Sequence, residues 1–494
     1  MGRKGPLSEG LISGSVGLIS RVAIQLCLLA VTLTATRFLA ISQFGIYSIA
    51  AALMFLSRNL FYVGPYEYLL KTPAHPGLKG ACLKANLGLA IVAAMLLLLF
   101  VSVSELIFGS QDLPFVLVRL VPTLFLSAVT AWYEAVLLRD QAIRRYYLFT
   151  VIGEIFGAGV AIAFFYYGFE LQSLIAQTYT RLGILLLLYL LSTRVEGWRN
   201  GSRADVRKVL DWSLSRLGAV FLNFSANYGA DFVLGIVLSP AATGLYRASN
   251  RIVSSISDLF AQPLQKIVQT NLSARSSKGL QPDHSWIAML TAVASIGWAA
   301  LLGLAVSAKQ VVPFVLGPAW EKAAPVVMVF CAARALSLID AATTSLLVCC
   351  DRQKFMLKVQ TSVAFLVPFT SLGLSLVMPH DSALAPTVVA IAYFMIMSAL
   401  TIAYCREAAR LSSASAREVL WALLISAVPG GFVAVTLVLL EMSHFGRGLE
   451  QRLFVPVAVA LSAVALGAGL LVIRKRLMTS IHSLGYVRLA GEEA

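Results

Sequence analysis

The sequence predicts an all-α polytopic membrane protein, and two observations carry this prediction. Of the 494 residues, 59% are hydrophobic and only 13% are charged, whereas soluble domains carry about 25% charged residues. Long apolar runs recur from one end of the chain to the other, and most match the roughly 20 residues that a helix needs to cross a bilayer. Because lipid offers no partner for free backbone groups, these runs are expected to be α-helices.

The apolar runs predict fourteen transmembrane helices. They lie at residues 11–33, 44–66, 83–107, 114–138, 147–168, 172–192, 213–237, 243–268, 286–308, 322–349, 359–378, 384–404, 418–440 and 453–473.

Basic residues alternate between the loops. The termini and every second loop hold 26 of the 39 Lys and Arg residues, and the opposite loops hold 4. Because basic loops stay in the cytoplasm, both termini are predicted to be cytoplasmic. The net charge of +15 is therefore mostly a matter of topology, and nucleic acid is not expected as a partner.

An internal repeat divides the chain. The stretch "LAISQFGIYSIA" (39–50) echoes "LSPAATGLYRAS" (238–249), and "LLRDQAIRRYYL" (137–148) echoes "LLVCCDRQKFML" (346–357). Both echoes fall at matching places in two sets of six helices. Such parallel repeats are related by an axis along the membrane normal, and transporters of this kind bind substrate between the two halves. The predicted domains are an N-lobe (1–192, helices 1–6), a cytoplasmic linker (193–212), a C-lobe (213–404, helices 7–12), a C-terminal helix pair (405–474) and a cytoplasmic tail (475–494).

The stretch 244–269 places charges at membrane depth. At 100° per residue, Arg247, Arg251 and Asp258 share one polar stripe of a helix. A central Arg or Asp costs about 2.5–3.5 kcal/mol in a membrane helix, so the stripe is expected to face protein or water. Arg247 lies near the outer end and can snorkel to the interface. Asp258 can be a structural partner of an arginine or a coupling site.

Charged and amide residues in other spans extend this pattern. Arginine stays charged and presents a planar fork that matches phosphate oxygens, so a cavity with surplus arginines suits a diphosphate group. The alternative for each residue is a structural ion pair or a helix-end anchor. The candidate substrate contacts are Arg21, Arg58, Arg216, Arg247, Arg251, Arg334, Asn223 and Asn227. The candidates for ion coupling or ion pairing are Glu134, Asp231, Asp258 and Asp340. Glu154 lies in "GEIFGAG", whose GxxxG predicts close helix packing.

The sequence predicts no catalytic, metal or cofactor site. The five histidines all lie in predicted loops or tails, and the six cysteines form no CxxC. No G-x-x-x-x-G-K-[ST] loop occurs, so direct use of ATP is not expected.

Two stretches carry a resemblance to a known family. "TRFLAISQFGIYSIAAAL" (36–53) has Arg-x-Leu followed by Phe-Gly-x-Tyr, and "ADFVLGIVLSPAATGLYRASNRI" (230–252) has Asp-x-x-x-Gly followed by Gly-Leu-Tyr-x-Ala. The chain thereby resembles the Wzx-type polysaccharide flippases of the multidrug/oligosaccharidyl-lipid/polysaccharide (MOP) exporter superfamily. The matching residues are Arg37, Leu39, Phe44, Gly45, Tyr47, Asp231, Gly235, Gly244, Leu245, Tyr246 and Ala248.

This resemblance implies a function. The family has two six-helix lobes around a cavity, which is cationic in lipid-linked flippases, and Arg21, Arg58 and Arg251 occupy comparable places here while Arg216 extends the set. The implied substrate is an undecaprenyl-diphosphate-linked oligosaccharide repeat unit of O-antigen, capsule or exopolysaccharide. It would cross the bacterial inner membrane by alternating access coupled to an ion gradient (H⁺ or Na⁺) or the membrane potential. The last two predicted helices resemble the extra pair that guides the lipid tail of the substrate in lipid II flippases. Implied partners are this substrate, membrane lipids, a polysaccharide polymerase and export machinery.

Other functions remain open from the sequence. A MATE-like ion-coupled exporter of small molecules, or a lipid II flippase, shares the expected fold. The arginine-rich spans speak against an exporter of cations. A membrane polysaccharide polymerase or ligase needs sizeable outer loops, whereas the longest here is roughly 441–452, where a lone His444 with nearby acids suits a solvated turn.

Overall fold

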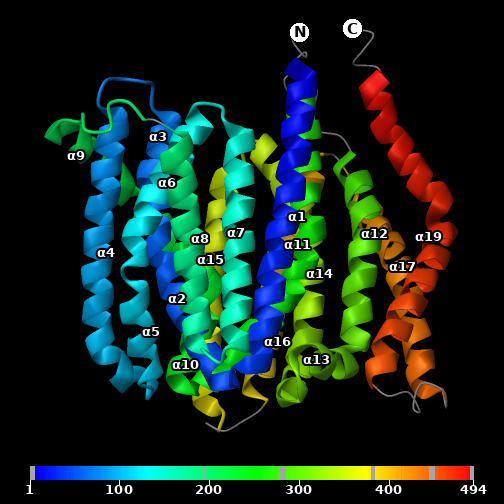
Figure 1. The fold of residues 1–494 in the computed structure, drawn as a ribbon. Coiled ribbons are helices and arrows are strands. Elements are labelled where there is room, and N and C mark those ends of the chain that lie inside the picture. The colour runs from blue at the N-terminus through cyan, green and yellow to red at the C-terminus, as the bar shows by residue number, and fades with distance from the viewer. Residues whose placement is uncertain are drawn as a thin grey trace. The chain divides into compact units, whose positions relative to one another are not determined.

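The computed structural model describes residues 6–193, 195–276, 285–379, 384–412, 414–443 and 451–489. Within these ranges every regular element is a helix, which confirms the predicted fold class. The elements are α1 (Pro6–Phe38), α2 (Ile41–Phe61), η1 (Tyr62–Tyr66), α3 (Glu67–Lys71), α4 (Leu78–Phe108), α5 (Asp112–Leu120), α6 (Thr123–Arg139), α7 (Ile143–Tyr166), α8 (Leu171–Ser192), α9 (Arg203–Ser215), α10 (Leu217–Val237), α11 (Pro240–Ser276), α12 (Ser285–Val306), α13 (Ala308–Leu316), η2 (Pro318–Ala323), α14 (Ala324–Cys349), α15 (Gln353–Val377), α16 (Ala385–Leu411), α17 (Ala416–Met442) and α19 (Gln451–Leu489) (Figure 1).

The apolar helices agree with the predicted spans. Twelve segments in the described ranges are long and apolar enough to cross a membrane, and α5 with α6, bent by 41° at their junction, makes a thirteenth. The remaining predicted span, 243–268, lies in α11, whose polar stripe lowers its mean hydropathy. The chain is therefore a multi-span membrane protein.

Helix α4 shows how a span divides between protein and lipid. Ala90, Ala93 and Leu97 on one face are buried, whereas the side chains of Met95 and Leu99 on the opposite face are 53% and 67% exposed. A contiguous exposed apolar surface of this kind is expected to contact lipid.

The chain forms two compact units, Met1–Gly244 (unit 1) and Leu245–Ala494 (unit 2). The boundary falls in the first turns of α11, after the predicted linker 193–212, because α10 packs against α2. That linker is partly helical: α9 begins after Ser202, whose hydroxyl accepts the backbone N–H of Asp205 at 3.1 Å, while the Asp205 carboxylate accepts the N–H of Ser202 at 3.2 Å. This reciprocal pair is a capping box.

Unit 1 is built around α6 and α7. Helix α7 packs against both α1 and α8, and α6 packs against α4 and α8 (Figure 1). Aromatic side chains fill the core between these helices: Tyr133 stacks on Tyr189 with ring centroids 5.6 Å apart, and the indole of Trp132 donates to the carbonyl of Lys79 at 2.8 Å. The indole N–H, which is the one polar group of this buried ring, therefore has a hydrogen-bond partner, as buried Trp side chains usually do.

The first sequence echo is a direct contact between the two repeats. A β-carbon on Gly45 would lie 1.8 Å from the carbonyl oxygen of Pro240, and one on Gly244 would lie 2.3 Å from that of Ile41. Ile41 opens α2 and Pro240 opens α11, each four residues before its glycine. The N-terminal turns therefore pack backbone to backbone in a reciprocal arrangement, which only glycine permits.

The second echo is a pair of equivalent turns. Gln141 after α6 and Asp351 after α14 adopt positive φ angles of 57° and 56°. In the first turn the N–H of Ala142 donates to the carbonyl of Leu137 at 2.8 Å, and in the second Arg352 donates to Leu347 at 2.9 Å. Both are Schellman-type ends. Gln141 and Asp351 are 210 residues apart, whereas the alignment of 137–148 with 346–357 has an offset of 209 residues. The structurally equivalent residues are therefore shifted by one position from the sequence alignment.

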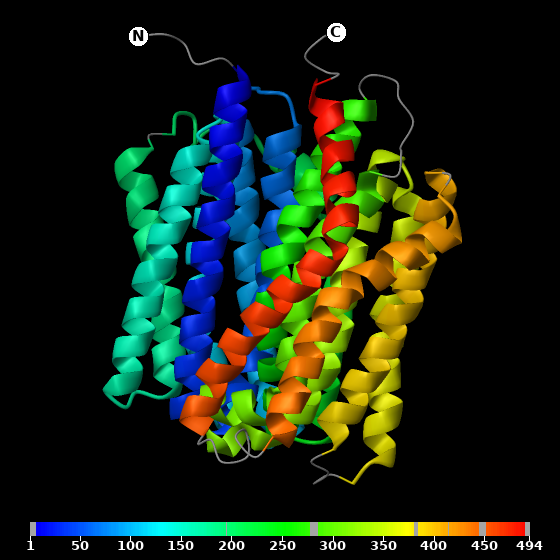
Figure 2. The same ribbon diagram turned by 90° about the vertical axis from the view of Figure 1, so that its right-hand side faces the viewer.

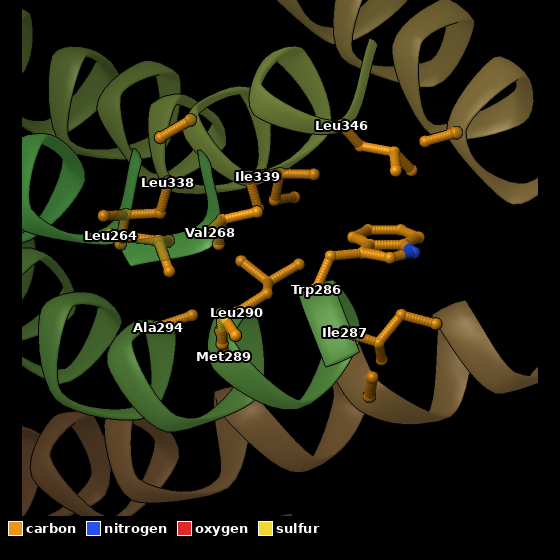
Figure 3. Packing of buried hydrophobic residues seen from close by; sticks show 14 of the residues in the cluster. Leu264, Val268, Trp286, Ile287, Met289, Leu290, Ala294, Leu338, Ile339 and Leu346 are labelled. Carbon is orange, nitrogen blue, oxygen red and sulfur yellow. The ribbon is translucent and has the colours of Figure 1, made fainter. Parts of the chain in front are cut away.

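Unit 2 has a core where α11, α12 and α14 meet. Leu264 of α11, Leu290 of α12 and Leu338 of α14 are fully buried there, together with the indole of Trp286 (Figure 3). The Trp286 Nε1 donates to the hydroxyl of Ser412 at 3.1 Å, so its polar edge is also satisfied.

The C-terminal helices α17 and α19 pack against each other and against α12 (Figure 2). Two glycines allow this approach. A β-carbon on Gly469 would lie 2.5 Å from the Cα of Pro429, and one on Gly430 would lie 2.6 Å from the side chain of Leu302. The outer faces of the pair carry exposed apolar side chains such as Leu439 and Val472. These two helices are thus an integral part of unit 2 with a surface suited to lipid.

Candidate functional site

Unit 1 brings together four charged side chains and one tyrosine from five elements, which we call the unit 1 charge cluster. Its members are Arg58 (α2), Tyr62 (η1), Glu134 (α6), Glu154 (α7) and Arg181 (α8). The hydroxyl of Tyr62 donates to Oε2 of Glu134 at 3.0 Å, and Arg181 donates to Oε1 of Glu154 at 2.8 Å. The two glutamates are 7% and 4% exposed. Electrostatic interactions join Arg58 to Glu134 and to Arg181, so the two pairs form one network.

A break in the second span positions Arg58 and Tyr62. Arg58 lies in the last turn of α2, and Tyr62, four residues later on the same face, opens the π-helical turn η1. Gly64 has non-helical angles (φ −93°, ψ −107°), and Pro65 follows it. Proline removes a backbone donor and bends a helix, and single π-turns are frequent at functional sites.

The GxxxG of α7 brings Glu154 to Arg181. A β-carbon on Gly153 would lie 2.9 Å from the side chain of Leu185, and one on Gly157 would lie 3.1 Å from the Arg181 side chain. This close packing of α7 on α8 agrees with the interpretation of the glycine motif. The close packing also brings Glu154 into an ion pair with Arg181, so Glu154 belongs to the unit 1 charge cluster. The GxxxG motif around Glu154 predicted the packing but not this ion pair.

The cluster is balanced in charge but not in hydrogen bonds. Two arginines face two carboxylates, yet among the described residues the buried Nε of Arg58 and Nδ2 of Asn59 have no acceptor. A buried donor without a partner costs about 1–3 kcal/mol. These donors are therefore suited to an acceptor from a ligand.

Arg21 adjoins this cluster from α1. It is half-buried and interacts electrostatically with Tyr146 of α7, which in turn interacts with Glu134. Close packing of α1 on α7 accounts for the position, since a β-carbon on Gly17 would lie 3.0 Å from the Tyr147 ring. The structure thus brings Arg21, Arg58 and Glu134 into one region of unit 1.

Arg216 lies in a second group, at the junction of α9 and α10. It forms an ion pair with Glu67, and its guanidinium lies 5.0 Å from the ring centroid of Trp212. Lys71 approaches the same ring, also at 5.0 Å. With 41% of its side chain exposed, Arg216 is accessible but already paired.

The other polar residues of α10 have different surroundings. Asn223 and Asn227 are exposed, and Nδ2 of Asn227 donates to Oδ1 of Asn223 at 2.7 Å. Asp231 is buried at 1% exposure, and its backbone carbonyl accepts the Thr243 hydroxyl at 2.9 Å. Asp231 therefore links the end of α10 to the start of α11.

In unit 2 two predicted residues, Arg334 and Asp258, interact with each other, and Arg334 also binds Asn250. Arg334 of α14 donates through Nε and Nη2 to Oδ1 of Asn250 on α11, at 3.2 and 2.7 Å. Asp258, two turns further along α11, interacts electrostatically with Arg334. Asp258 of α11 thus interacts with a cation from another helix.

Arg247 and Arg251 of α11 are half-buried, and both engage in interactions in the structure. The carbonyl of Arg251 accepts hydroxyls from Ser254 and Ser255, at 3.0 and 2.8 Å. Such back-bonding satisfies serine hydroxyls inside the stripe.

Asp340 lies apart from these charges. Its Oδ1 accepts the hydroxyl of Thr401 on α16 at 2.8 Å, and its backbone carbonyl accepts that of Thr344 at 2.5 Å. Across the described ranges, no group of His, Cys, Asp and Glu side chains is arranged to hold a metal ion. His444 lies outside the described residues.

Comparison with known proteins agrees with this architecture. A family model described as "Polysaccharide biosynthesis protein" matches residues 35–325, more than half of the chain. The chain belongs to this polysaccharide biosynthesis protein family. No curated protein sequence matches the chain significantly.

Two solved structures share the fold of this family member. One is the lipid II flippase MurJ in an inward closed conformation, with a TM-score of 0.72 and 10% identity over 94% of this chain and 100% of MurJ. The other is an inward-facing multidrug resistance MATE family transporter of the MOP superfamily, with a TM-score of 0.57 and 12% identity over 81% of this chain and 100% of the transporter. The fold that the resemblance to the MOP superfamily implied is thereby confirmed.

Proposed function

We propose that this protein is a flippase for lipid-linked oligosaccharide, which carries undecaprenyl-diphosphate-linked repeat units across the bacterial inner membrane by alternating access. Membership in a polysaccharide biosynthesis family and the flippase fold support the class of function. The observation that favours an anionic head group is the unit 1 charge cluster, where the buried Nε of Arg58 has no acceptor among the described residues.

In this proposal the diphosphate accepts hydrogen bonds from Arg58, with Arg21 close by in the same unit. Arg216 at the α9–α10 junction would first attract the anion, since its side chain is partly exposed. Arg247, Arg251 and Arg334 are the candidate head-group contacts within unit 2, and the exposed amides Asn223 and Asn227 of unit 1 suit sugar hydroxyls. The prenyl chain would stay in lipid along the apolar surfaces of the spans.

The proposal also covers the orientation in the membrane, the polymer and the partner proteins. The termini would be cytoplasmic, the polymer would be O-antigen, capsule or exopolysaccharide, and a polysaccharide polymerase with its export machinery would take over the translocated unit. A lipid II flippase would handle the same diphosphate chemistry, whereas a MATE-like exporter would not depend on buried arginines.

The test replaces Arg58 by alanine in cells that depend on this protein. Arg58→Ala is expected to cause lipid-linked oligosaccharide to accumulate on the cytoplasmic side and surface polysaccharide to fall by at least tenfold. Arg119→Ala is the matched control, because the Arg119 side chain is exposed and its guanidinium lies over the ring of Phe115 in the same helix. Normal polysaccharide output from Arg58→Ala at equal protein level would contradict the proposal. Efflux of ethidium by the wild type would instead support the exporter, and rescue of lipid II translocation would support that substrate.

A further inference from the structure

The charge balance of the unit 1 charge cluster has a consequence for transport. With both glutamates ionised, Arg58 and Arg181 are neutralised by Glu134 and Glu154, and the cluster has no net charge. An anion that enters beside Arg58 would then add negative charge to a buried region. Such a charge is costly unless it is compensated.

The two carboxylates are not equivalent. Glu154 is held in a direct ion pair with Arg181, with 2.8 Å between the charged atoms. Among the described residues, Glu134 has only the neutral Tyr62 hydroxyl at hydrogen-bond distance, at 3.0 Å, and it interacts with the arginines over a longer range. Protonation of Glu134 therefore breaks no ion pair, whereas protonation of Glu154 would leave Arg181 without its partner.

We propose that Glu134 is a proton-binding site linked to the anion site at Arg58, so that the diphosphate and one proton bind to unit 1 together. This inference rests on the proposed function. A proton from solvent adds to a carboxylate oxygen of Glu134, and no other bond changes. The cluster then carries one positive charge, which offsets part of the negative charge of the diphosphate at Arg58. After the anion leaves, loss of the proton restores the neutral cluster.

The groups around Glu134 are consistent with this assignment. Helix α6 packs against α2, η1, α3, α4, α7 and α8. The charged groups of α3 and α4 are engaged elsewhere or exposed. Glu67 pairs with Arg216, Lys71 lies over Trp212, Lys79 pairs with Asp140, and Lys84 donates to the carbonyl of Gly201, while Glu105 is exposed. The titratable groups that interact with Glu134 are Arg58, Tyr62, Tyr66, Tyr146, Arg181 and Tyr189. Free Tyr and Arg side chains have a pKa of about 10 or above, whereas that of a free Glu side chain is about 4.3. Among these interacting groups, Glu134 is therefore the one suited to bind and release a proton.

The experiment measures proton uptake on anion binding. Full-length protein in nanodiscs is titrated calorimetrically with farnesyl diphosphate at pH 8, in two buffers of different ionisation enthalpy. The wild type is expected to take up close to one proton per bound anion. Glu134→Gln is expected to bind the anion without that uptake, and its affinity should not fall with pH. The wild-type affinity should fall by up to tenfold per pH unit relative to this variant.

Controls separate this inference from the proposed function. Glutamine still offers an acceptor to Tyr62, and thermal unfolding checks that the variant is folded. Glu105→Gln, at an exposed carboxylate of α4, should leave proton uptake as in the wild type. Equal proton uptake by the wild type and Glu134→Gln would overturn the proton site while leaving the flippase proposal intact. Uptake abolished by Asp340→Asn instead would move the site to unit 2. Absence of any binding that depends on Arg58 would overturn the anion site itself.

Discussion

The contact between the two repeat glycines offers a sharp test of the fold. Replacing Gly45 by alanine adds a β-carbon 1.8 Å from the carbonyl oxygen of Pro240 and 2.9 Å from the backbone N of Gly244. Ordinary contacts start near 3.4 Å, so α2 and α11 would have to separate by more than an ångström. Overpacking of this kind costs about 1–3 kcal/mol, and a backbone neighbour cannot rotate away, which favours the upper end. Alanine regains about 1 kcal/mol of helix propensity, leaving about 2 kcal/mol of destabilisation.

Thermal unfolding of the purified protein in detergent measures this cost. Gly45→Ala is expected to lower the midpoint temperature by several degrees, and Gly244→Ala, with 2.3 Å to the carbonyl of Ile41, should act similarly. Gly88→Ala in α4 is the control, since its β-carbon would meet nothing within 4 Å. The reasoning would be refuted if Gly45→Ala were as stable as Gly88→Ala.

Three further substitutions test other contacts, each by unfolding in detergent. Arg181→Met should cost about 3–5 kcal/mol because it leaves the Glu154 charge buried without its partner; the double variant with Glu154→Gln should recover most of this, and additive costs would argue against the pair. Trp286→Ala should cost about 3–5 kcal/mol through the cavity it leaves in a fully packed core, so a change below 1 kcal/mol would contradict the packing in Figure 3. Glu67→Gln should change stability by less than about 1 kcal/mol, because its ion pair with Arg216 is about 40% exposed on both sides; a larger loss would show that this pair is structural.

Much of the fold could be predicted from the sequence, because lipid makes the hydrophobic signal strong. Each predicted span corresponds to a helix or, at 114–138, to the bent pair α5–α6. The span predicted at 243–268 with a polar stripe lies in α11, which is not among the helices apolar enough to be candidate spans. The repeat was visible through Gly45 and Gly244, since a backbone contact tolerates no other residue. The turn repeat was placed one residue off because the letters of Gln141 and Asp351 differ although their backbone angles agree.

The site was only partly predictable. Arg58 and Glu134 stood out because charge is costly inside a span, but their partners come from other helices, and one sequence does not specify which faces meet. Arg181 was missed for this reason, although the GxxxG around Glu154 marked where α7 and α8 pack closely. The start of α9 could have been predicted, because Ser202 and Asp205 have the spacing of a capping box.

The most direct test of the central claim measures translocation itself. Proteoliposomes containing the purified protein and a fluorescent prenyl-diphosphate-linked oligosaccharide would be assayed for movement of the label between leaflets. The account predicts translocation by the wild type, loss of at least tenfold in initial rate for Arg58→Ala, partial retention for Arg58→Lys, and no loss for Arg119→Ala. Equal rates for the wild type and Arg58→Ala in equally folded protein would contradict the claim that the buried arginine binds the diphosphate.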